Sequence, residues 1–322
     1  MNRIRRAAVS RVGRVVLLAN VLVVALLAGS GVRDSLAGVG NVAAPHWSVP
    51  RPDRIIAVGD TSCWPIEITS VTCRMDEVVP LAEAADLLLL LGDVAQNHGT
   101  AEEYEKGFDP TWGRIVGRSF PVAGNHDYET DGAAPYYAYF GERAGEAGHG
   151  FYSVDLSGWR IYALNSNCSQ VGCGPDSPQW HWLSRVLESD PGCSLAMLHH
   201  PFRSSVEGFD PADAELVAPL YRLLIDARVP LVLTGHAHLY ERVAIGGRTQ
   251  QITTGTGGYG FHPLAHAKRI EGSRAAIERT FGVLELRLED RAYTTTFLPI
   301  DGGRRDEERR TCGPESGKRT TN

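Results

Sequence analysis

Residues 87–93 read Leu-Leu-Leu-Leu-Leu-Gly-Asp, an apolar run that stops abruptly at a glycine and an acidic residue. An unbroken run of this length is typical of a strand that is buried on both faces and covered by helices. Similar runs, each ending at a polar or glycine residue, recur along the chain at Ile55–Gly59, Phe120–Ala123, Trp159–Leu164, Leu195–Leu198 and Leu231–Thr234. The stretch therefore indicates one strand of an α/β sheet system.

Helical patterns alternate with these runs, which favours parallel strands joined by helices. The predicted helices are Met75–Ala85, Glu102–Lys106, Pro178–Glu188 and Ala212–Ala227. Three later segments alternate in polarity or carry threonine, which fits antiparallel strands: Gln250–Thr254, Val283–Leu288 and Tyr293–Leu298. We therefore expect an α/β fold with mixed sheets, two of them packed face to face between helical layers.

Metal-ligating side chains follow the apolar runs, where ligands bind in open α/β sheets. The sets are Gly59-Asp60, Gly92-Asp93, Gly124-Asn125-His126-Asp127, His199-His200-Pro201 and Gly235-His236-Ala237-His238. Oxygen and imidazole ligands without thiolates favour Fe, Mn or Zn, and there are enough of them for two ions. In a compact two-metal site, Asp60 or Asp93 would have to bridge both ions.

The first forty residues have the order of an export signal. Five arginines precede an apolar run at Val15–Ala28, which is followed by the small residues at 29–31. This order predicts a cleaved signal, with an uncleaved membrane anchor as the alternative and a buried core helix as the least favoured one. We therefore expect an exported protein that is secreted or anchored at the cell surface.

Removal of residues 1–40 would make the protein strongly acidic. The whole chain has a formal net charge of −6, and this segment carries six arginines and one aspartate, so about −11 would remain. An acidic surface repels polyanions, so we expect a small substrate held by bound cations and no nucleic-acid partner. The sequence indicates no protein partner.

Six cysteines in an exported chain predict disulfides. Cys63 and Cys73 bracket one loop, Cys168 and Cys173 bracket a tighter one, and the remaining pair, Cys193 and Cys312, would fix the polar C-terminal tail. Zinc binding is the alternative, but neither loop has ligand spacing typical of a zinc site.

The ordered sets of ligands resemble the signature of the calcineurin-like metallophosphoesterases, over roughly Arg54–Leu298. The run Gly235-His236-Ala237-His238-Leu239-Tyr240-Glu241-Arg242 is similar to that of the purple acid phosphatase branch, as are Asn165-Ser166-Asn167-Cys168, His199-His200-Pro201 and Gly255-Thr256-Gly257-Gly258. The resemblance implies a four-layer α/β/β/α sandwich of the metallophosphoesterase type. It implies a catalytic domain at 51–300, between the signal or anchor at 1–40 and a polar tail at 301–322.

The resemblance also implies a role for each ligand. Asp93 would bridge two metal ions. Asp60 and His238 would complete what we call the first-metal half of the site, and Asn125, His199 and His236 the second-metal half. His126 would act as general acid toward the leaving group, with Asp127 or a backbone carbonyl orienting its ring. By its position, rather than by the resemblance, His200 follows a ligand on the same strand end and so points elsewhere, either to touch the substrate phosphate or to cap a loop.

The first-metal half departs from both family patterns. Gln96 stands where the purple acid phosphatases have an iron-binding tyrosine, and Ser62 stands where the wider superfamily has a histidine. Gln96 through its amide oxygen, His98, or water could replace the ligand. A neutral oxygen ligand would favour harder divalent ions, so we do not expect a purple protein.

The resemblance implies an enzyme that hydrolyses phosphate esters with a hydroxide activated by two divalent or trivalent metal ions. Phosphomonoesters are the expected substrates, as for an acid phosphatase. The alternatives are a phosphodiesterase with the same site and a catalytically weak binding protein that keeps the fold.

Overall fold

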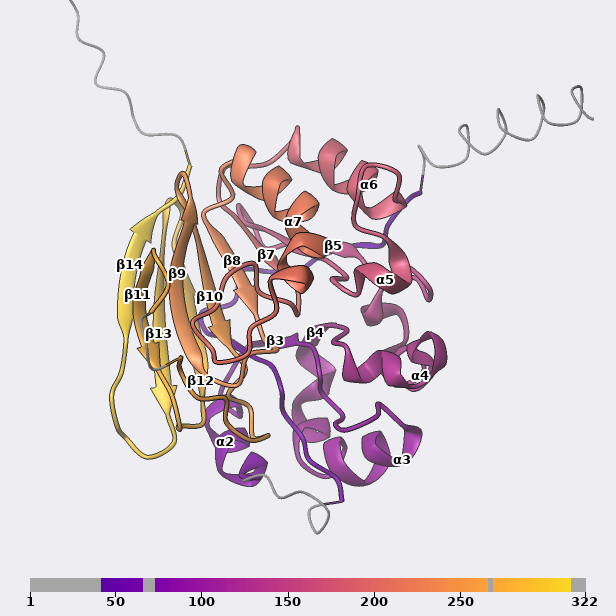
Figure 1. Cartoon of the computed structure of the whole chain (residues 1–322). Coiled ribbons are helices and arrows are strands. Elements are labelled where there is room, and N and C mark those ends of the chain that lie inside the picture. Colours follow the sequence, from indigo (N-terminus) through magenta and orange to yellow (C-terminus); the bar gives the residue numbers. More distant parts are fainter. Residues whose placement is uncertain (1–41, 66–72, 266–268, 314–322) are drawn as a thin grey trace, which may run out of the picture. The chain divides into compact units, whose positions relative to one another are not determined.

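Two mixed sheets form the centre of the folded unit Ala43–Asn322 (Figure 1). The computed structural model describes residues 42–65, 73–265 and 269–313. One sheet has the order β14-β13-β12-β2-β3-β4 and the other β1-β5-β6-β7-β8-β10-β9-β11. The strands are β1 His46–Ser48, β2 Ile55–Val58, β3 Leu87–Leu91, β4 Ser119–Val122, β5 Tyr152–Asp155, β6 Arg160–Ala163, β7 Ser194–Met197, β8 Leu231–Thr234, β9 Tyr240–Gly246, β10 Thr249–Thr254, β11 Ser273–Ile277, β12 Gly282–Leu288, β13 Ala292–Pro299 and β14 Glu307–Thr311.

Helices cover the outer faces of both sheets, with α2, α3 and α4 on one side and α5, α6 and α7 on the other (Figure 1). The α-helices are α2 Met75–Ala82, α3 Ala101–Glu103, α4 Ala134–Phe140, α5 Cys168–Val171, α6 Pro178–Leu187 and α7 Pro211–Asp226. A π-helical turn at Tyr104–Phe108 continues α3, and short 3₁₀ turns lie at Trp112–Arg118, His126–Glu129, Asp131–Ala133 and Gly141–Ala144.

Strand β2 shows how its sequence builds the layers. A strand turns successive side chains to opposite faces, so an apolar run fits a sheet that is buried on both sides. Ile55 and Ala57 join the core between the two sheets, which also contains Leu195 of the other sheet. Ile56 and Val58 join the core beneath α2 and α4. The expected four-layer α/β/β/α fold is confirmed.

Local signals start the helices close to where the sequence predicts them. Thr100 and Glu103 form a capping box at α3, satisfying backbone N–H groups that a helix start leaves unpaired. Ser177 accepts a hydrogen bond from the backbone N–H of Trp180 at the start of α6. Asp210 does the same for α7, where Pro211 supplies a favourable first residue.

The C-terminal polar segment is ordered farther than its composition suggests. Residues 307–311 form β14, which pairs antiparallel with β13. The guanidinium of Arg242 holds Asp306 at 2.7 Å and Glu308 at 2.9 Å, and the Tyr240 hydroxyl donates to Asp306 at 2.8 Å. Part of the expected tail therefore belongs to the six-stranded sheet.

All six cysteines form disulfides, in the pairs Cys63–Cys73, Cys168–Cys173 and Cys193–Cys312. The expected disulfides are confirmed, and the zinc alternative is excluded because no thiol remains free. The predicted signal or anchor at 1–40 lies outside the described residues. Among the residues that the structure describes, none of the helices has both the length and the hydropathy that a membrane span needs.

Candidate metal centre

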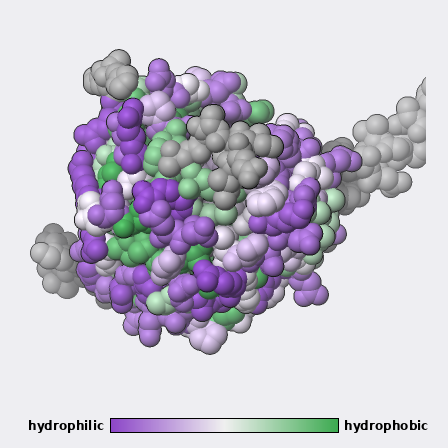
Figure 2. Space-filling view, turned by 90° about the horizontal axis from the view of Figure 1, so that it is seen from below, coloured by the Kyte–Doolittle hydropathy of each residue, from purple (hydrophilic) through white to green (hydrophobic). Residues whose placement is uncertain are grey.

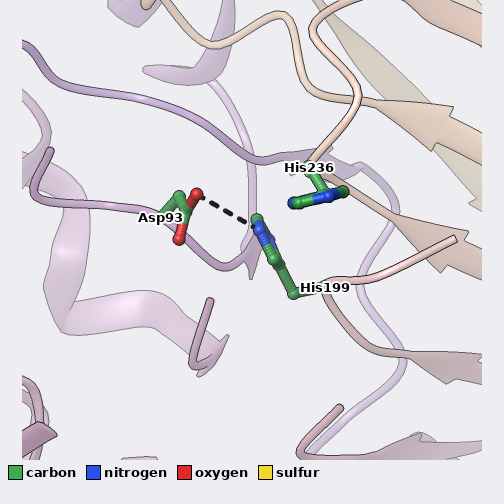
Figure 3. Close-up of side chains that lie close together, drawn as sticks. All are labelled: Asp93, His199 and His236. Atoms are coloured by element: carbon green, nitrogen blue, oxygen red, sulfur yellow. Dashed lines mark ion pairs between the residues drawn. The ribbon is translucent and has the colours of Figure 1, made fainter. Parts of the chain in front are cut away.

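The expected ligands lie together at the carboxyl ends of five strands. Asp60, Asp93 and Asn125 follow β2, β3 and β4, which run parallel in one sheet. His199 and His236 follow β7 and β8, which run parallel in the other. In Figure 3 the side chains of Asp93, His199 and His236 lie close together and point toward one another. Parallel neighbours thus deliver ligands from both sheets to one edge.

The second-metal half is compact. The Asp93 Oδ2 and His199 Nε2 atoms are 3.2 Å apart. The Asn125 Oδ1 atom lies 3.1 Å from His199 Nε2 and 2.9 Å from His236 Nδ1. Ligand atoms of Asp93, His199 and His236 all fall within 4.8 Å of one another. Two imidazoles, a carboxylate and an amide oxygen on one small volume fit a borderline divalent or trivalent cation.

The first-metal half is buried and carries its own contacts. The His238 Nε2 atom lies 3.1 Å from Asp60 Oδ1, and the Asp60 side chain is fully buried. The other oxygen of Asp60 accepts a hydrogen bond from the backbone N–H of His236 at 2.9 Å. Gln96 Nε2 donates to Asp60 Oδ1 at 3.3 Å and to Asp93 Oδ2 at 3.2 Å. All six expected ligands therefore converge, with Gln96 between the two carboxylates.

Glycines make room for the carboxylates and a histidine ring. A Cβ at Gly124 would lie 2.1 Å from Asp93 Oδ1, and one at Gly92 would lie 2.5 Å from His199 Nδ1. Contacts below 3.0 Å essentially never occur for real Cβ atoms. The glycines that precede the ligands therefore let the backbone approach them closely.

Three of the expected ligands adopt left-handed backbone conformations that side-chain-bearing residues seldom occupy. The φ angles are 59° at Asp60, 50° at Asp93 and 67° at His236. Such strain is retained where the surrounding structure fixes it, commonly at functional sites. It aims these side chains off the strand ends toward the centre.

Electrostatics couple Asp93 to His199. Burial raises the pKa of Asp93, but the His199 ring outweighs it and holds the pKa below its usual value. For His199 burial acts in the other direction and lowers the pKa, but Asp93 raises that pKa to about 9. A cation bound by His199 would replace the ring proton, because a histidine ligand must be neutral.

The ring of His126 is held by a backbone carbonyl. Its Nδ1 atom donates to the Asn97 carbonyl at 2.5 Å, and its Nε2 atom lies 3.9 Å from Asp93 Oδ2. Its pKa is lowered by burial but raised overall by Asp93, the Asn97 carbonyl and Glu129. Of the two groups expected to orient the ring, Asp127 and a backbone carbonyl, the carbonyl is the one that contacts it.

Asp127 has another partner set. It accepts hydrogen bonds from the backbone N–H groups of Gly124 at 2.8 Å and Asp93 at 3.2 Å, and from the Tyr104 hydroxyl at 2.7 Å. Burial and nearby Asp93 raise the pKa of Asp127 to about 7. Asp127 thus joins the ends of β3 and β4. The sequence did not predict the contact of Tyr104 with Asp127, because the two residues are 23 positions apart.

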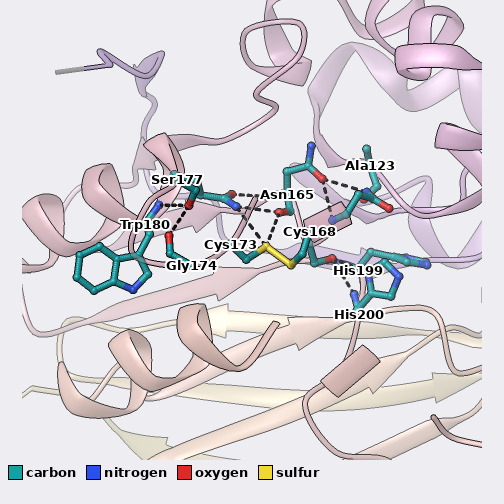
Figure 4. Close-up of a disulfide and its surroundings, with 12 residues drawn as sticks. Ala123, Asn165, Cys168, Cys173, Gly174, Ser177, Trp180, His199 and His200 are labelled. Carbon is teal, nitrogen blue, oxygen red and sulfur yellow. Dashed lines mark hydrogen bonds between the residues drawn. A yellow bond between two sulfur atoms is a disulfide. The ribbon is translucent and has the colours of Figure 1, made fainter. Parts of the chain in front are cut away.

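His200 is held by Ser166. The Ser166 Oγ atom accepts the backbone N–H groups of His199 at 3.1 Å and His200 at 3.0 Å, and lies 2.8 Å from His200 Nδ1. Burial and His199 lower the pKa of His200 to about 3. The disulfide Cys168–Cys173 lies beside this segment (Figure 4), and its Cys173 sulfur lies 3.8 Å from the carbonyl oxygen of Asn165.

A cavity of about 270 Å³ opens onto the second-metal half, lined by Asn125, Ser166, His200, Asp213, Leu216 and His236 among others. Leu216 is 51% exposed, the only large apolar side chain so exposed among the described residues. The face of the molecule shown in Figure 2 is mainly hydrophilic, with smaller hydrophobic patches between polar groups. The cavity suits a small ligand with one apolar part.

This two-sheet fold, with oxygen and imidazole ligands at five strand ends, is that of a metallophosphoesterase. The family model "calcineurin-like phosphoesterase" matches residues 53–240, and the chain belongs to that family. Members of the family carry a dinuclear metal centre, and the residues present fit one because the donors, the glycine-lined space and an unpaired buried amide oxygen on Gln96 converge there.

One curated relative is similar to part of the chain, and two solved structures share its fold. The chain is 30% identical over 178 residues to "Probable purple acid phosphatase 20" of Arabidopsis thaliana, a match that covers 49% of this chain and 40% of that protein. The purple acid phosphatase PPD1 from yellow lupin (Lupinus luteus) seeds has a TM-score of 0.69 at 16% identity, covering 84% of this chain and 55% of that one. GAP50, described as the anchor in the inner membrane complex of Plasmodium, has a TM-score of 0.62 at 14% identity, covering 83% and 90%.

Proposed function

We propose that this protein is an exported metallophosphoesterase that hydrolyses phosphomonoesters. One observation carries the proposal: Asp93 and five further expected ligands from two sheets lie together, with the Nε2 atom of His126 3.9 Å from the Asp93 carboxylate. Three disulfides support export, because they persist in oxidising compartments.

The ligands would divide between two cations, whose identity among Fe, Mn and Zn stays open. Asn125, His199 and His236 would hold one, Asp60 and His238 the other, and Asp93 would be shared. When bound, such cations neutralise phosphoryl oxygens and lower the pKa of water.

His126 is positioned to move a proton. Its Nδ1 hydrogen is committed to the Asn97 carbonyl, since a carbonyl only accepts. Its Nε2 atom therefore remains for the leaving group. As water adds to phosphorus and the ester P–O bond breaks, the imidazolium form of His126 would give its Nε2 proton to the departing oxygen and become neutral.

His200 would bind a phosphoryl oxygen. Ser166 Oγ already accepts two backbone N–H groups, so its own hydrogen is directed to His200 Nδ1. That bond leaves the ring hydrogen on Nε2, a donor for an oxygen acceptor in the cavity that His200 lines.

The cavity supports a monoester. Its volume of about 270 Å³ suits one organic arm, with Leu216 and Val217 as apolar contacts. Asp213 at its wall disfavours an additional anionic group on that arm, because like charges repel.

A catalytically weak binding protein is the second candidate, and Gln96 is the observation that favours it. The fold alone does not require catalysis, and the matched Plasmodium protein is described as an anchor. This candidate binds a phosphate-bearing ligand without turnover.

One assay separates these functions. The purified chain is stripped of metal, reloaded in turn with Mn²⁺, iron and Zn²⁺, and assayed with p-nitrophenyl phosphate and its bis ester. We expect metal-dependent hydrolysis, faster on the monoester. Faster hydrolysis of the bis ester would identify a phosphodiesterase, and no hydrolysis with any metal would favour the binding protein.

A further inference from the structure

The side chain of Gln96 is buried between the two carboxylates of the metal centre. Gln96 has no exposed surface. Its Nε2 atom donates to Asp60 Oδ1 at 3.3 Å and to Asp93 Oδ2 at 3.2 Å. Its Oε1 atom is also buried but has no hydrogen-bond partner. The amide is therefore satisfied on one side only.

An unpaired buried amide oxygen is rare and calls for a partner that the polypeptide does not supply. The amide oxygen and nitrogen have nearly the same shape, so a half-turn of the terminal bond exchanges them without moving neighbours. After that turn, Oε1 would face Asp60 and Asp93. Three oxygens facing one another repel, unless a cation lies among them, in which case all three become ligands.

His98 does not compete for this position. Its side chain is 63% exposed, and its ring nitrogens lie 3.5 Å from Glu103 and 3.8 Å from Glu129. It therefore lies in an acidic surface environment rather than between the buried carboxylates.

His262 also has a different place. Its ring stacks on that of His238 with centroids 4.0 Å apart, and its Nδ1 atom accepts the backbone N–H of His238 at 3.1 Å. His262 therefore contacts His238 rather than either of the two carboxylates. Among the described side chains, Gln96 is thus the neutral amide that contacts both carboxylates.

We propose that Gln96 is a ligand of the first-metal half through Oε1, and that its amide turns over when metal binds. The proposal rests on the metal centre of the proposed function. In this structure the NH₂ group of Gln96 donates to both Asp60 and Asp93. In the loaded protein the amide oxygen coordinates, giving a site with carboxylate and amide oxygens beside one imidazole, which favours Mn²⁺ over softer ions.

The test is Mn²⁺ binding to the metal-free chain, measured by calorimetry and by electron paramagnetic resonance. We expect about two equivalents for wild type, with magnetically coupled ions, because a two-metal site shares a ligand. Gln96→Leu, which has similar bulk but no oxygen, should weaken the first-metal half by about 10- to 100-fold or more and leave one uncoupled Mn²⁺. His98→Ala is the matched control and should bind as wild type does.

Gln96→Glu separates a ligand from a structural amide. A carboxylate there adds a third negative oxygen, so we expect thermal stability to fall without metal and to recover with Mn²⁺. Absence of recovery would show that an oxygen at position 96 does not meet a bound ion, and would overturn the proposal. Three further results would each overturn the proposal. Gln96→Leu would bind two ions as tightly as wild type does, His98→Ala would lose the ion of the first-metal half, or wild type would bind a single ion. Absence of any Mn²⁺, Fe or Zn binding by wild type would instead refute the metal centre itself.

Discussion

Replacement of Gly124 by alanine should disable the metal centre through one added methyl group. The new Cβ would lie 2.1 Å from Asp93 Oδ1 and 2.4 Å from the backbone nitrogen of Asp93. Since real Cβ atoms stay at least 3.0 Å from such neighbours, the carboxylate has to retreat by about 0.9 Å. Asp93 cannot retreat freely, because Oδ1 also accepts the His126 N–H at 2.9 Å.

A displacement of about 1 Å at a reacting centre typically lowers turnover by about 10²-fold. We expect that loss in kcat for Gly124→Ala on p-nitrophenyl phosphate, together with weaker binding of the ions that share Asp93. Overpacking should also lower the free energy of unfolding by about 1–3 kcal/mol.

The assay measures kcat at saturating metal, bound metal per chain, and the urea midpoint. Gly117→Ala is the matched control, because Gly117 lies on the surface and an added Cβ meets nothing within 4 Å. Full activity and full metal content in Gly124→Ala would refute the proposed role of Asp93.

Further expectations concern the proton donor, the C-terminal segment and one disulfide. His126→Ala should slow turnover by about 10²- to 10⁴-fold and keep its metal; metal loss would make His126 a ligand. Asp306→Asn should lower the free energy of unfolding at pH 7. Burial raises the pKa of Asp306, but hydrogen bonds from Arg242 and a neighbouring tyrosine lower it overall. The difference from wild type should therefore be full above pH about 4 and shrink as the pH falls further; a pH-independent difference would contradict it. Replacing both Cys193 and Cys312 by serine removes a disulfide between residues 119 positions apart. The free energy of unfolding from urea titration should fall by about 2–5 kcal/mol, and an unchanged urea midpoint would exclude a stabilising role for this disulfide.

Much of the expected ligand set could be predicted because short local sequence patterns indicate it. An apolar run such as Leu87–Leu91 indicates a buried strand, and the Gly-Asp that follows indicates a turn at its carboxyl end. To predict that five such strand ends lie together, only one further rule was needed, namely that the carboxyl ends of parallel strands lie at one edge of a sheet. The structure brings all of them together, although their chemical roles remain proposals.

Other features depend on contacts between distant residues, which local patterns do not carry. The ordering of β14 rests on Arg242 reaching Asp306, 64 residues away, so composition alone indicated a tail. The choice between Gln96 and His98 required burial, since both follow Asp93 within five residues. Helix α4, Ala134–Phe140, is rich in aromatic residues and short, and its pattern gave no helical period.

Asp93 is central to the proposed metal centre, and measuring metal content and hydrolysis together in Asp93→Ala tests its role most directly. The wild-type chain and the variant are loaded with Mn²⁺, their folding is compared by urea midpoint, and p-nitrophenyl phosphate hydrolysis is followed. We expect a folded variant that loses metal and hydrolysis together, because the carboxylate is shared between both halves of the site. Hydrolysis at the wild-type rate, with metal still bound, would contradict the account.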